Sequence, residues 1–86
     1  MLHTILRIPA VKARSGYSRS TIYLRIGQGL WTSPVSLGPR AVGWPACEID
    51  ALNAARIAGQ TDDQIRTLVE SLHAQRKELA AAGGPK

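Results

Sequence analysis

The pattern of apolar and polar positions is clearest over residues 18–29, where it has the period of a helix. Three apolar side chains fall on one stripe at about 100° per residue: Ile22, Tyr23 and Ile26. Ser18 is a suitable N-cap, and Gly27 and Gly29 favour termination of the helix at the other end. The opposite face carries mostly hydroxyl, guanidinium and amide groups: Ser20, Thr21, Leu24, Arg25 and Gln28.

A second predicted helix precedes this one. Pro9 suits the first turn of a helix and Gly16 suits its end, so we expect a helix over residues 9–15. About three residues, including a glycine, then lead to the Ser18 cap, which is typical of a helix-turn-helix. Four side chains are expected to form the small core between the two helices: Val11, Tyr17, Ile22 and Ile26.

Residues 1–8 precede the paired helices and are expected to form a short extended arm. Ile5 and Ile8 are predicted to cover the core, while His3 and Arg7 face outward. Arms of this kind more often fray than bind.

After the second helix the pattern changes to the period of a strand. Residues 35–37 alternate apolar and polar, residues 38–40 have turn composition, and residues 41–44 return as a second short strand. This predicts a hairpin with Arg40 near its tip. Trp44 is a large core side chain that would close the hairpin onto the helices.

A third helix is expected after the hairpin. Pro45 suits its start, and Gly59 ends it. Ile49, Leu52 and Arg56 follow at helical spacing, with Ile57 beside them. Glu48 and Asp50 lie near the start of this helix. Residues two apart on a helix point in different directions, which argues against a catalytic pair.

A fourth helix should begin at Thr61, which forms a capping box with Gln64, and run to about Ala82. Its apolar stripe comprises Ile65, Leu68, Val69, Leu72 and Leu79, and the seven-residue spacing of 65, 72 and 79 resembles a short coiled-coil seam. Two interpretations remain open: the helix folds back on its own domain, or residues 61–82 mediate self-association.

Length and composition indicate one domain. The 86 residues allow a small core, and the single cysteine, Cys47, suits a reducing cytoplasm and is expected to be a core filler. Together with His3 and His73 it makes no plausible set of metal ligands, so we expect neither metal nor cofactor. The chain carries no membrane-spanning run and no signal peptide, which predicts a cytoplasmic, nucleoid-associated protein without a membrane partner.

The distribution of charge points to a polyanionic partner. Residues 1–44 carry a charge of +6 and no acidic side chain, whereas residues 45–86 sum to −1. The excess positive charge therefore lies in the helix-turn-helix and the hairpin, as expected of a nucleic-acid-binding half.

Three stretches then resemble a known family in order and spacing: SGYSRSTIYLRIGQG, PVSLGPRAVGW and EIDAL. They are similar to the AlpA-type phage and prophage regulators, which are related to phage excisionases and more distantly to MerR-type activators. The resemblance covers residues 5–58 and implies a winged helix-turn-helix that binds DNA. The chain departs from the family at Leu24, where arginine or lysine often follows the tyrosine, and at Leu30-Trp31, which replaces an acidic-aromatic-proline run.

The fold we predict is therefore mostly helical, a winged helix-turn-helix of the MerR and excisionase type with a two-stranded wing and an extra C-terminal helix. Its domain spans residues 1–58, the added helix residues 59–82 and a tail residues 83–86. Expected phosphate contacts are made by Arg14, Ser18, Arg19 and Arg40. Expected base contacts are made by Ser20, Thr21, Arg25 and Gln28.

The predicted function is sequence-specific binding of double-stranded DNA without catalysis, because no nucleophile, base or metal constellation is present. One role is a transcriptional regulator of a phage or mobile element. The alternative is an excisionase that bends DNA for an integrase or recombinase. From a different class, the runner-up is a small adaptor that binds protein through its C-terminal helix.

Overall fold

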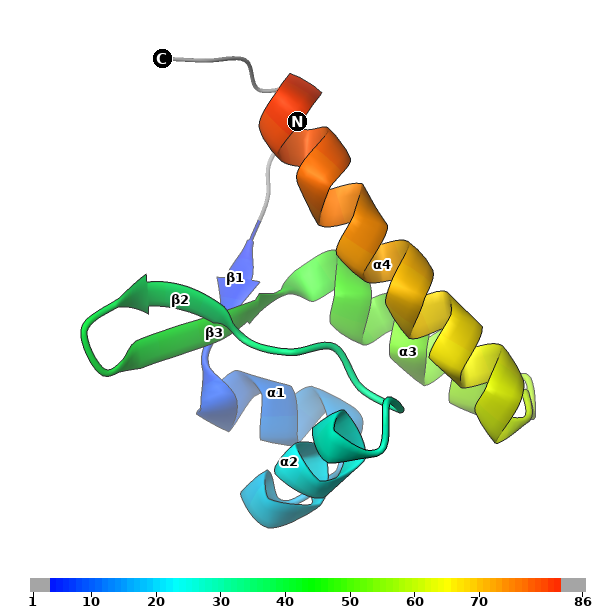
Figure 1. Ribbon diagram of the computed structural model, residues 1–86. Helices are drawn as coiled ribbons and strands as arrows, with labels where there is room; N and C mark the ends of the chain where they lie inside the picture. Colours follow the sequence, from blue (N-terminus) through cyan, green and yellow to red (C-terminus); the bar gives the residue numbers. More distant parts are fainter. Residues whose placement is uncertain (1–3, 83–86) are drawn as a thin grey trace.

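The structure, a computed structural model, describes residues 4–82 and the side chains of residues 4–78. His3, the side chain of Leu79 and the tail 83–86 therefore lie outside the described residues. The elements in order are β1 (Ile5–Leu6), α1 (Ile8–Ser15), α2 (Arg19–Gly27), β2 (Val35–Gly38), β3 (Ala41–Pro45), α3 (Ala46–Ile57) and α4 (Asp62–Ala82). Figure 1 shows α1 and α2 at one end, the β2–β3 hairpin projecting to one side, and α4 alongside α3. This mostly helical arrangement is compatible with a winged helix-turn-helix.

The paired helices α1 and α2 begin and end where the sequence predicts. Pro9 lies in the first turn of α1, and Gly16 ends that helix in the left-handed conformation at φ 77°. The hydroxyl of Ser18 accepts a hydrogen bond from the backbone N–H of Thr21 at 3.2 Å and so caps α2. The predicted core between the helices is also confirmed, because Val11 and Ile22 are fully buried and Tyr17 and Ile26 pack against them.

The expected two-stranded wing is part of a larger sheet. The strand order is β1-β3-β2 with antiparallel pairing throughout, and the predicted arm supplies β1. Successive side chains of a strand point to opposite faces, so Leu6 enters the core while Ile5 stays on the other face, 39% exposed. The prediction that Ile5 covers the core is therefore wrong, whereas Ile8 does pack against it.

Gly43 allows the arm to pass close to β3. A Cβ atom at this position would come within 2.5 Å of the Ile5 side chain and 3.0 Å of the Leu6 carbonyl oxygen. A larger residue would push β1 away from the sheet, so the absence of a side chain at Gly43 is what permits the third strand.

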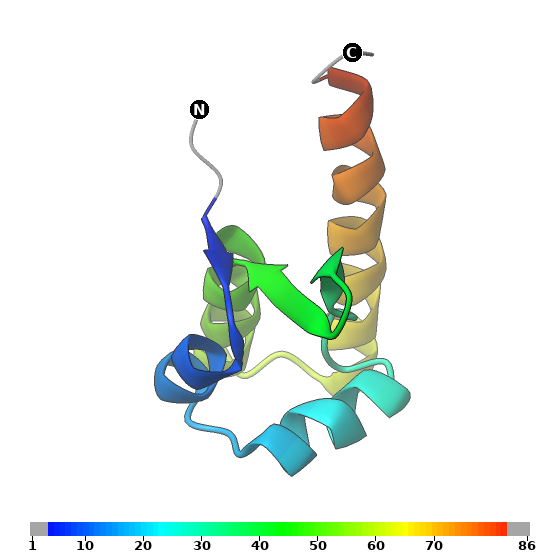
Figure 2. The same cartoon turned by 90° about the vertical axis from the view of Figure 1, so that its left-hand side faces the viewer.

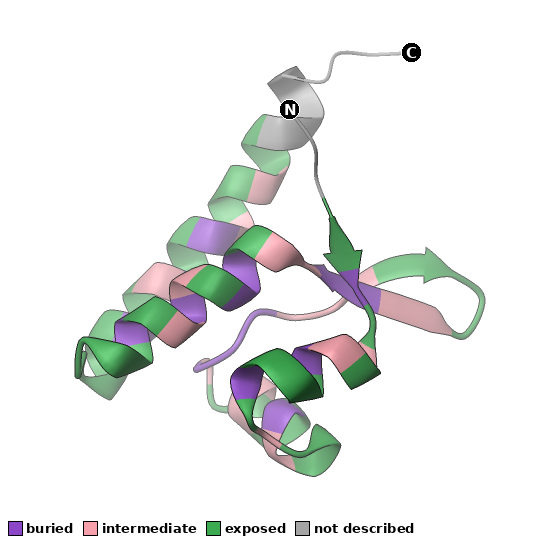
Figure 3. Ribbon diagram, turned by 180° about the vertical axis from the view of Figure 1, so that it is seen from behind, coloured by how far each residue is buried: buried purple, intermediate pink, exposed green. Residues whose placement is uncertain are grey.

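Two tryptophans fill the centre of the core. Trp44 is fully buried as expected, and its indole N–H donates to the carbonyl oxygen of Thr32 at 2.8 Å. Trp31, which the sequence marked only as a departure from the family, is also buried, at 1% exposed. Figure 3 shows the buried positions gathered between the helices and at the inner end of β3, while the tip of the hairpin is exposed.

One expectation for α3 is wrong, because Cys47 is exposed rather than a core filler. Ile57, at the end of the helix, is also exposed, at 87%. The buried apolar face of α3 is formed by side chains one turn apart: Ile49, Leu52 and Ala55. Cys47 and Ile57 lie at other angles around the helix and therefore point away from this face.

The fourth helix folds back on the domain. Its capping box is present, with Thr61 N–H donating to Gln64 Oε1 at 2.9 Å and Gln64 N–H donating to Thr61 Oγ1 at 3.2 Å. The stripe joins the common core, with Leu68 packed at its border and three side chains fully inside it: Ile65, Val69 and Leu72. Those side chains are not open to a second copy, so self-association through the predicted seam is not supported.

Arg76 ties α4 to α3 and to the segment before the wing. Its guanidinium donates to both carboxylate oxygens of Glu48, at 2.7 and 2.6 Å, and to the carbonyl oxygen of Ser33 at 2.7 Å. One turn earlier, His73 Nε2 accepts the backbone N–H of Ser33 at 3.1 Å. The Glu48 side chain is only 4% exposed, and Arg76 is the cation that pairs with it there.

Replacing Arg76 by methionine should lower the free energy of unfolding by about 3 kcal/mol, because it leaves the Glu48 carboxylate buried without its partner. Urea unfolding followed by circular dichroism measures this. Adding Glu48→Gln should recover part of the loss by removing the buried charge. Lys77→Met is the matched control, because Lys77 is the exposed next residue, and an equal loss there would contradict the importance of the pair.

Candidate nucleic-acid interface

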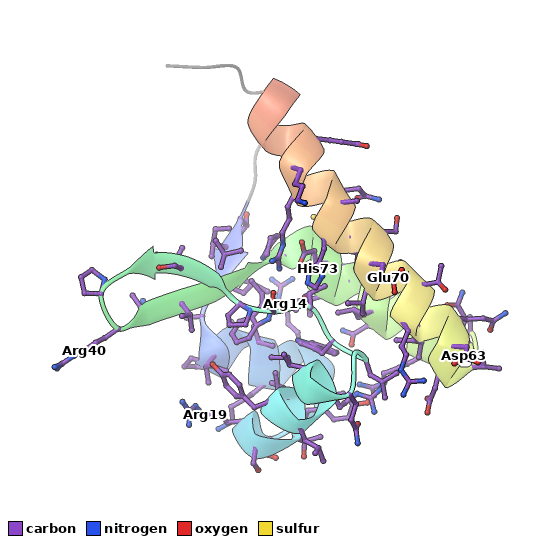
Figure 4. All side chains as sticks on the ribbon, in the orientation of Figure 1. Arg14, Arg19, Arg40, Asp63, Glu70 and His73 are labelled. Carbon is purple, nitrogen blue, oxygen red and sulfur yellow. The ribbon has the colours of Figure 1, made fainter. Side chains whose placement is uncertain are left out.

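The predicted contact residues lie mainly on the exposed face of α2 and at the tip of the hairpin. Ser20, Leu24 and Gln28 are exposed along α2, and Thr21 is half-buried. Figure 2 shows α2 running below the β2–β3 hairpin. In Figure 4 the side chains of Arg19 and Arg40 both point outward, from α2 and from the tip of the wing respectively.

Ser18 serves first as the helix cap. Besides accepting the Thr21 N–H, its hydroxyl lies 3.0 Å from Thr21 Oγ1 and 3.3 Å from Ser20 Oγ. The first turn of α2 therefore presents linked hydroxyls next to backbone N–H groups at the positive end of the helix dipole. This combination favours a phosphate oxygen.

Each arginine of α2 lies over a tyrosine ring. The Arg19 guanidinium carbon is 5.2 Å from the Tyr23 centroid, and that of Arg25 is 5.0 Å from the Tyr17 centroid. These distances are within the range of cation–π attraction. By angle on a helical wheel, Arg19 falls on the inner side, from which we expect it to reach around to the DNA backbone, and Arg25 falls on the outer side. In the structure Arg19 is exposed, whereas Arg25 is half-buried, with its Nε enclosed and without a hydrogen-bond partner. The rings, rather than the wheel angle, determine where the charges lie.

The two tyrosines rest in turn on the buried tryptophans. Tyr17 meets Trp31 edge-on with ring centroids 5.8 Å apart, and Tyr23 meets Trp44 edge-on at 6.3 Å. Such edge-to-face pairs fix the ring orientation. Each arginine of α2 is therefore positioned through a tyrosine by a side chain of the core.

Arg40 occupies a strained backbone position at the tip of the wing. Its φ is 62°, and it is the one non-glycine residue with positive φ in the part of the chain that the structure describes. This conformation costs an ordinary residue roughly 1–2 kcal/mol, and asparagine or glycine would adopt it more easily. The presence of arginine there favours a role for its side chain.

Arg14 differs from the other predicted contacts. It lies near the end of α1, and its guanidinium is 4.0 Å from the exposed Asp50 carboxylate of α3. Such a surface pair is weak, but it offsets part of the positive charge. Ion pairs recorded among the described residues involve Arg14, Arg66 and Arg76, and none of them includes Arg19, Arg25 or Arg40.

The sequence interpretation missed the supports behind this surface. Arg66 of α4 donates from Nε to the carbonyl oxygen of Gln28, at the C-cap of α2, with a distance of 3.0 Å. Arg56 of α3 lies 4.3 Å from the Tyr17 centroid and donates to the Ser15 carbonyl oxygen. These contacts join residues about 38 to 41 positions apart, so no local pattern indicates them.

The described residues also bear on two other features, a metal site and a membrane-spanning helix. Within residues 4–82, no three or more His, Cys, Asp or Glu side chains gather where they could hold a metal ion. Over the same residues, no helix combines the length and the apolar character needed to cross a membrane.

Comparison with known proteins agrees with the resemblance in the sequence. Residues 4–57 match the family of the Prophage CP4-57 regulatory protein (AlpA), so the chain belongs to this family. It is also 47% identical over 55 residues to "Uncharacterized protein ORF88" of Enterobacteria phage P4. That match covers 64% of this chain and 62% of the phage protein. No solved structure matches the chain significantly.

Substitutions of Ser18 can distinguish its role as the N-cap of α2 from its proposed role in binding a phosphate. Asparagine and aspartate are both good N-caps, so Ser18→Asn and Ser18→Asp should melt within a few degrees of the parent protein. Aspartate adds a negative charge where a phosphate is expected, so Ser18→Asp should weaken duplex binding about tenfold more than Ser18→Asn. Melting curves and fluorescence anisotropy measure the two effects, and equal affinities would show that no phosphate lies at this cap.

Proposed function

We propose that this AlpA-family protein binds double-stranded DNA sequence-specifically and regulates transcription of genes of a phage or mobile element. The family description, a prophage regulatory protein, supports the regulatory role over that of an excisionase. In this proposal α2 enters the major groove, and the hairpin contacts the adjacent backbone or minor groove. The DNA-contacting residues are Arg14, Ser18, Arg19, Ser20, Thr21, Arg25, Gln28 and Arg40.

The observation that carries this proposal is the positioning of guanidinium groups at the two expected contact points. Arg19 and Arg25 lie over tyrosines on α2, and Arg40 points away from the tip of the wing. No Asp or Glu occurs in residues 4–44 to oppose them. A helix fits the roughly 12 Å width of the major groove, and a neighbouring arginine suits phosphate or the minor groove.

The arrangement of α4 weighs against the adaptor alternative. That alternative needs the apolar stripe of α4 to receive a partner protein, but Ile65, Val69 and Leu72 are buried in the domain itself. The exposed residues of α4 include the acidic side chains of Asp62, Asp63, Glu70 and Glu78. Of these, Asp63 is paired with Arg66, which also donates to the Gln28 carbonyl oxygen at the C-cap of α2.

Affinity for duplex DNA should fall steeply with salt. If about four to six phosphates are neutralised, the logarithm of the binding constant against the logarithm of salt concentration should slope roughly −4 to −5 per protein. Anisotropy titrations between 50 and 200 mM salt, about the range used for such measurements, give the slope. Lys77→Met on the far helix should leave it unchanged, and a flat salt response of the parent protein would refute DNA binding altogether.

Arg25 and Arg40 should affect binding in different ways. Arg25→Ala should reduce discrimination between a preferred and a mutated site by about 1–3 kcal/mol, because a guanidinium reads guanine in the major groove. Arg40→Asn should weaken binding to all duplexes similarly and reduce the salt slope by about 1. Asparagine also relieves the positive φ, so the melting temperature should not fall.

A matched control tests whether the effect of Arg25→Ala arises only from losing the contact with the Tyr17 ring. Arg56→Ala also removes a cation from the Tyr17 ring, but from α3 rather than from the proposed contact helix. It should leave discrimination between sites intact. If Arg25→Ala weakens every sequence equally, Arg25 contacts only the DNA backbone and the assignment of base contacts along α2 is wrong.

A further inference from the structure

Leu24 is an apolar side chain at the centre of a polar surface. It is 61% exposed, whereas Ile22 on the same helix is fully buried and Tyr23 is 37% exposed. Ser20 and Thr21 lie one turn before it, and Gln28 lies one turn after it. Leu24 therefore occupies the middle of the α2 face that we propose enters the major groove.

Nothing around Leu24 accounts for a leucine at this position. It belongs neither to the buried core nor to the partly buried side chains packed against it. Gly27, one turn later on the same face, has nothing within 4 Å of where its Cβ would lie, so that side of Leu24 is open. Single exposed apolar residues are common on proteins and need no explanation. Leu24 differs because it stands where neighbours on the same face can bond to DNA.

We propose that Leu24 contacts the C5-methyl group of a thymine in the major groove and so selects an A·T pair at that step. This inference rests on the proposed function. Among the four bases, thymine is the one that presents a methyl group on the major-groove edge, and the other edges there offer donors and acceptors. A leucine makes no hydrogen bond to any of these edges, so its preference would come from apolar contact with the methyl group, which cytosine and the purines lack.

The aliphatic contact complements the arginine beside it. Arg25 is the next residue and is held over Tyr17, 5.0 Å from the ring centroid. The contact with the ring restricts where its guanidinium lies. Neighbouring positions of α2 would then read two different features of the groove, a methyl group and a hydrogen-bonding edge.

The test removes the methyl group alone. The preferred site is first selected from a random duplex library with the full chain, and each thymine in it is then replaced singly by deoxyuridine. We expect one such replacement to weaken the parent protein about three- to fivefold, the effect of one methyl-sized apolar contact. Leu24→Ala should bind the thymine and uracil duplexes equally well, while Leu24→Met should still distinguish them.

Ile57→Ala provides the matched control. Ile57 is 87% exposed, but it lies at the end of α3 rather than on α2. This variant should distinguish thymine from uracil as the parent protein does. A parent protein insensitive to every uracil replacement, or a Leu24→Ala variant as sensitive as the parent, would overturn the Leu24 contact while leaving DNA binding intact. A selection that enriches no sequence would instead overturn the sequence-specific function, and the Leu24 contact with it.

Discussion

The bidentate pair between Arg76 and Glu48 is the interaction on which the arrangement of the molecule depends. It joins α4 to the first turn of α3, and the same guanidinium holds the carbonyl oxygen of Ser33. Arg66, nearer the start of α4, holds the Gln28 carbonyl oxygen at the C-cap of α2. The connection between α2 and the hairpin is thus attached to α4 at both ends. This helix lies beyond residues 4–57, the part that matches the family, yet it is bonded to the segment that links the two proposed DNA contacts.

A buried ion pair contributes little net stability, because desolvating two charges costs about as much as their attraction returns. The contribution of this pair is instead to fix the position of α4 relative to α3, because its hydrogen bonds are directional. The apolar contacts of Ile65, Val69 and Leu72 are not directional, so they fix the position of α4 less sharply than hydrogen bonds do. A guanidinium with three short hydrogen bonds fits one position only. We therefore attribute the registry of α4 to Arg76 and the strength of its attachment to Ile65, Val69 and Leu72.

The elements that the sequence predicted well are those with local signals. The cap at Ser18, the left-handed Gly16, the capping box at Thr61 and the turn before Arg40 each involve residues close together in the chain. Strand β1 was missed because two residues show no period, and its partner Trp44 is 38 positions away. The placement of α4 was left open for the same reason, since nothing local links Arg76 to Glu48. The exposure of Cys47 followed from which side of α3 meets the core, which composition does not reveal.

The arginines of α2 are oriented by contacts that lead back to buried side chains of the core. A helical wheel treats each side chain independently, so it does not reveal that Arg19 is exposed while Arg25 is half-buried. In the structure each guanidinium lies over a tyrosine, and each tyrosine meets a buried tryptophan edge-on, Tyr23 with Trp44 and Tyr17 with Trp31. A long flexible arginine loses rotamer freedom when it binds, and that cost is lower if the side chain is already held. The two buried tryptophans therefore also help to orient, through the tyrosines, the guanidinium groups that we propose contact DNA.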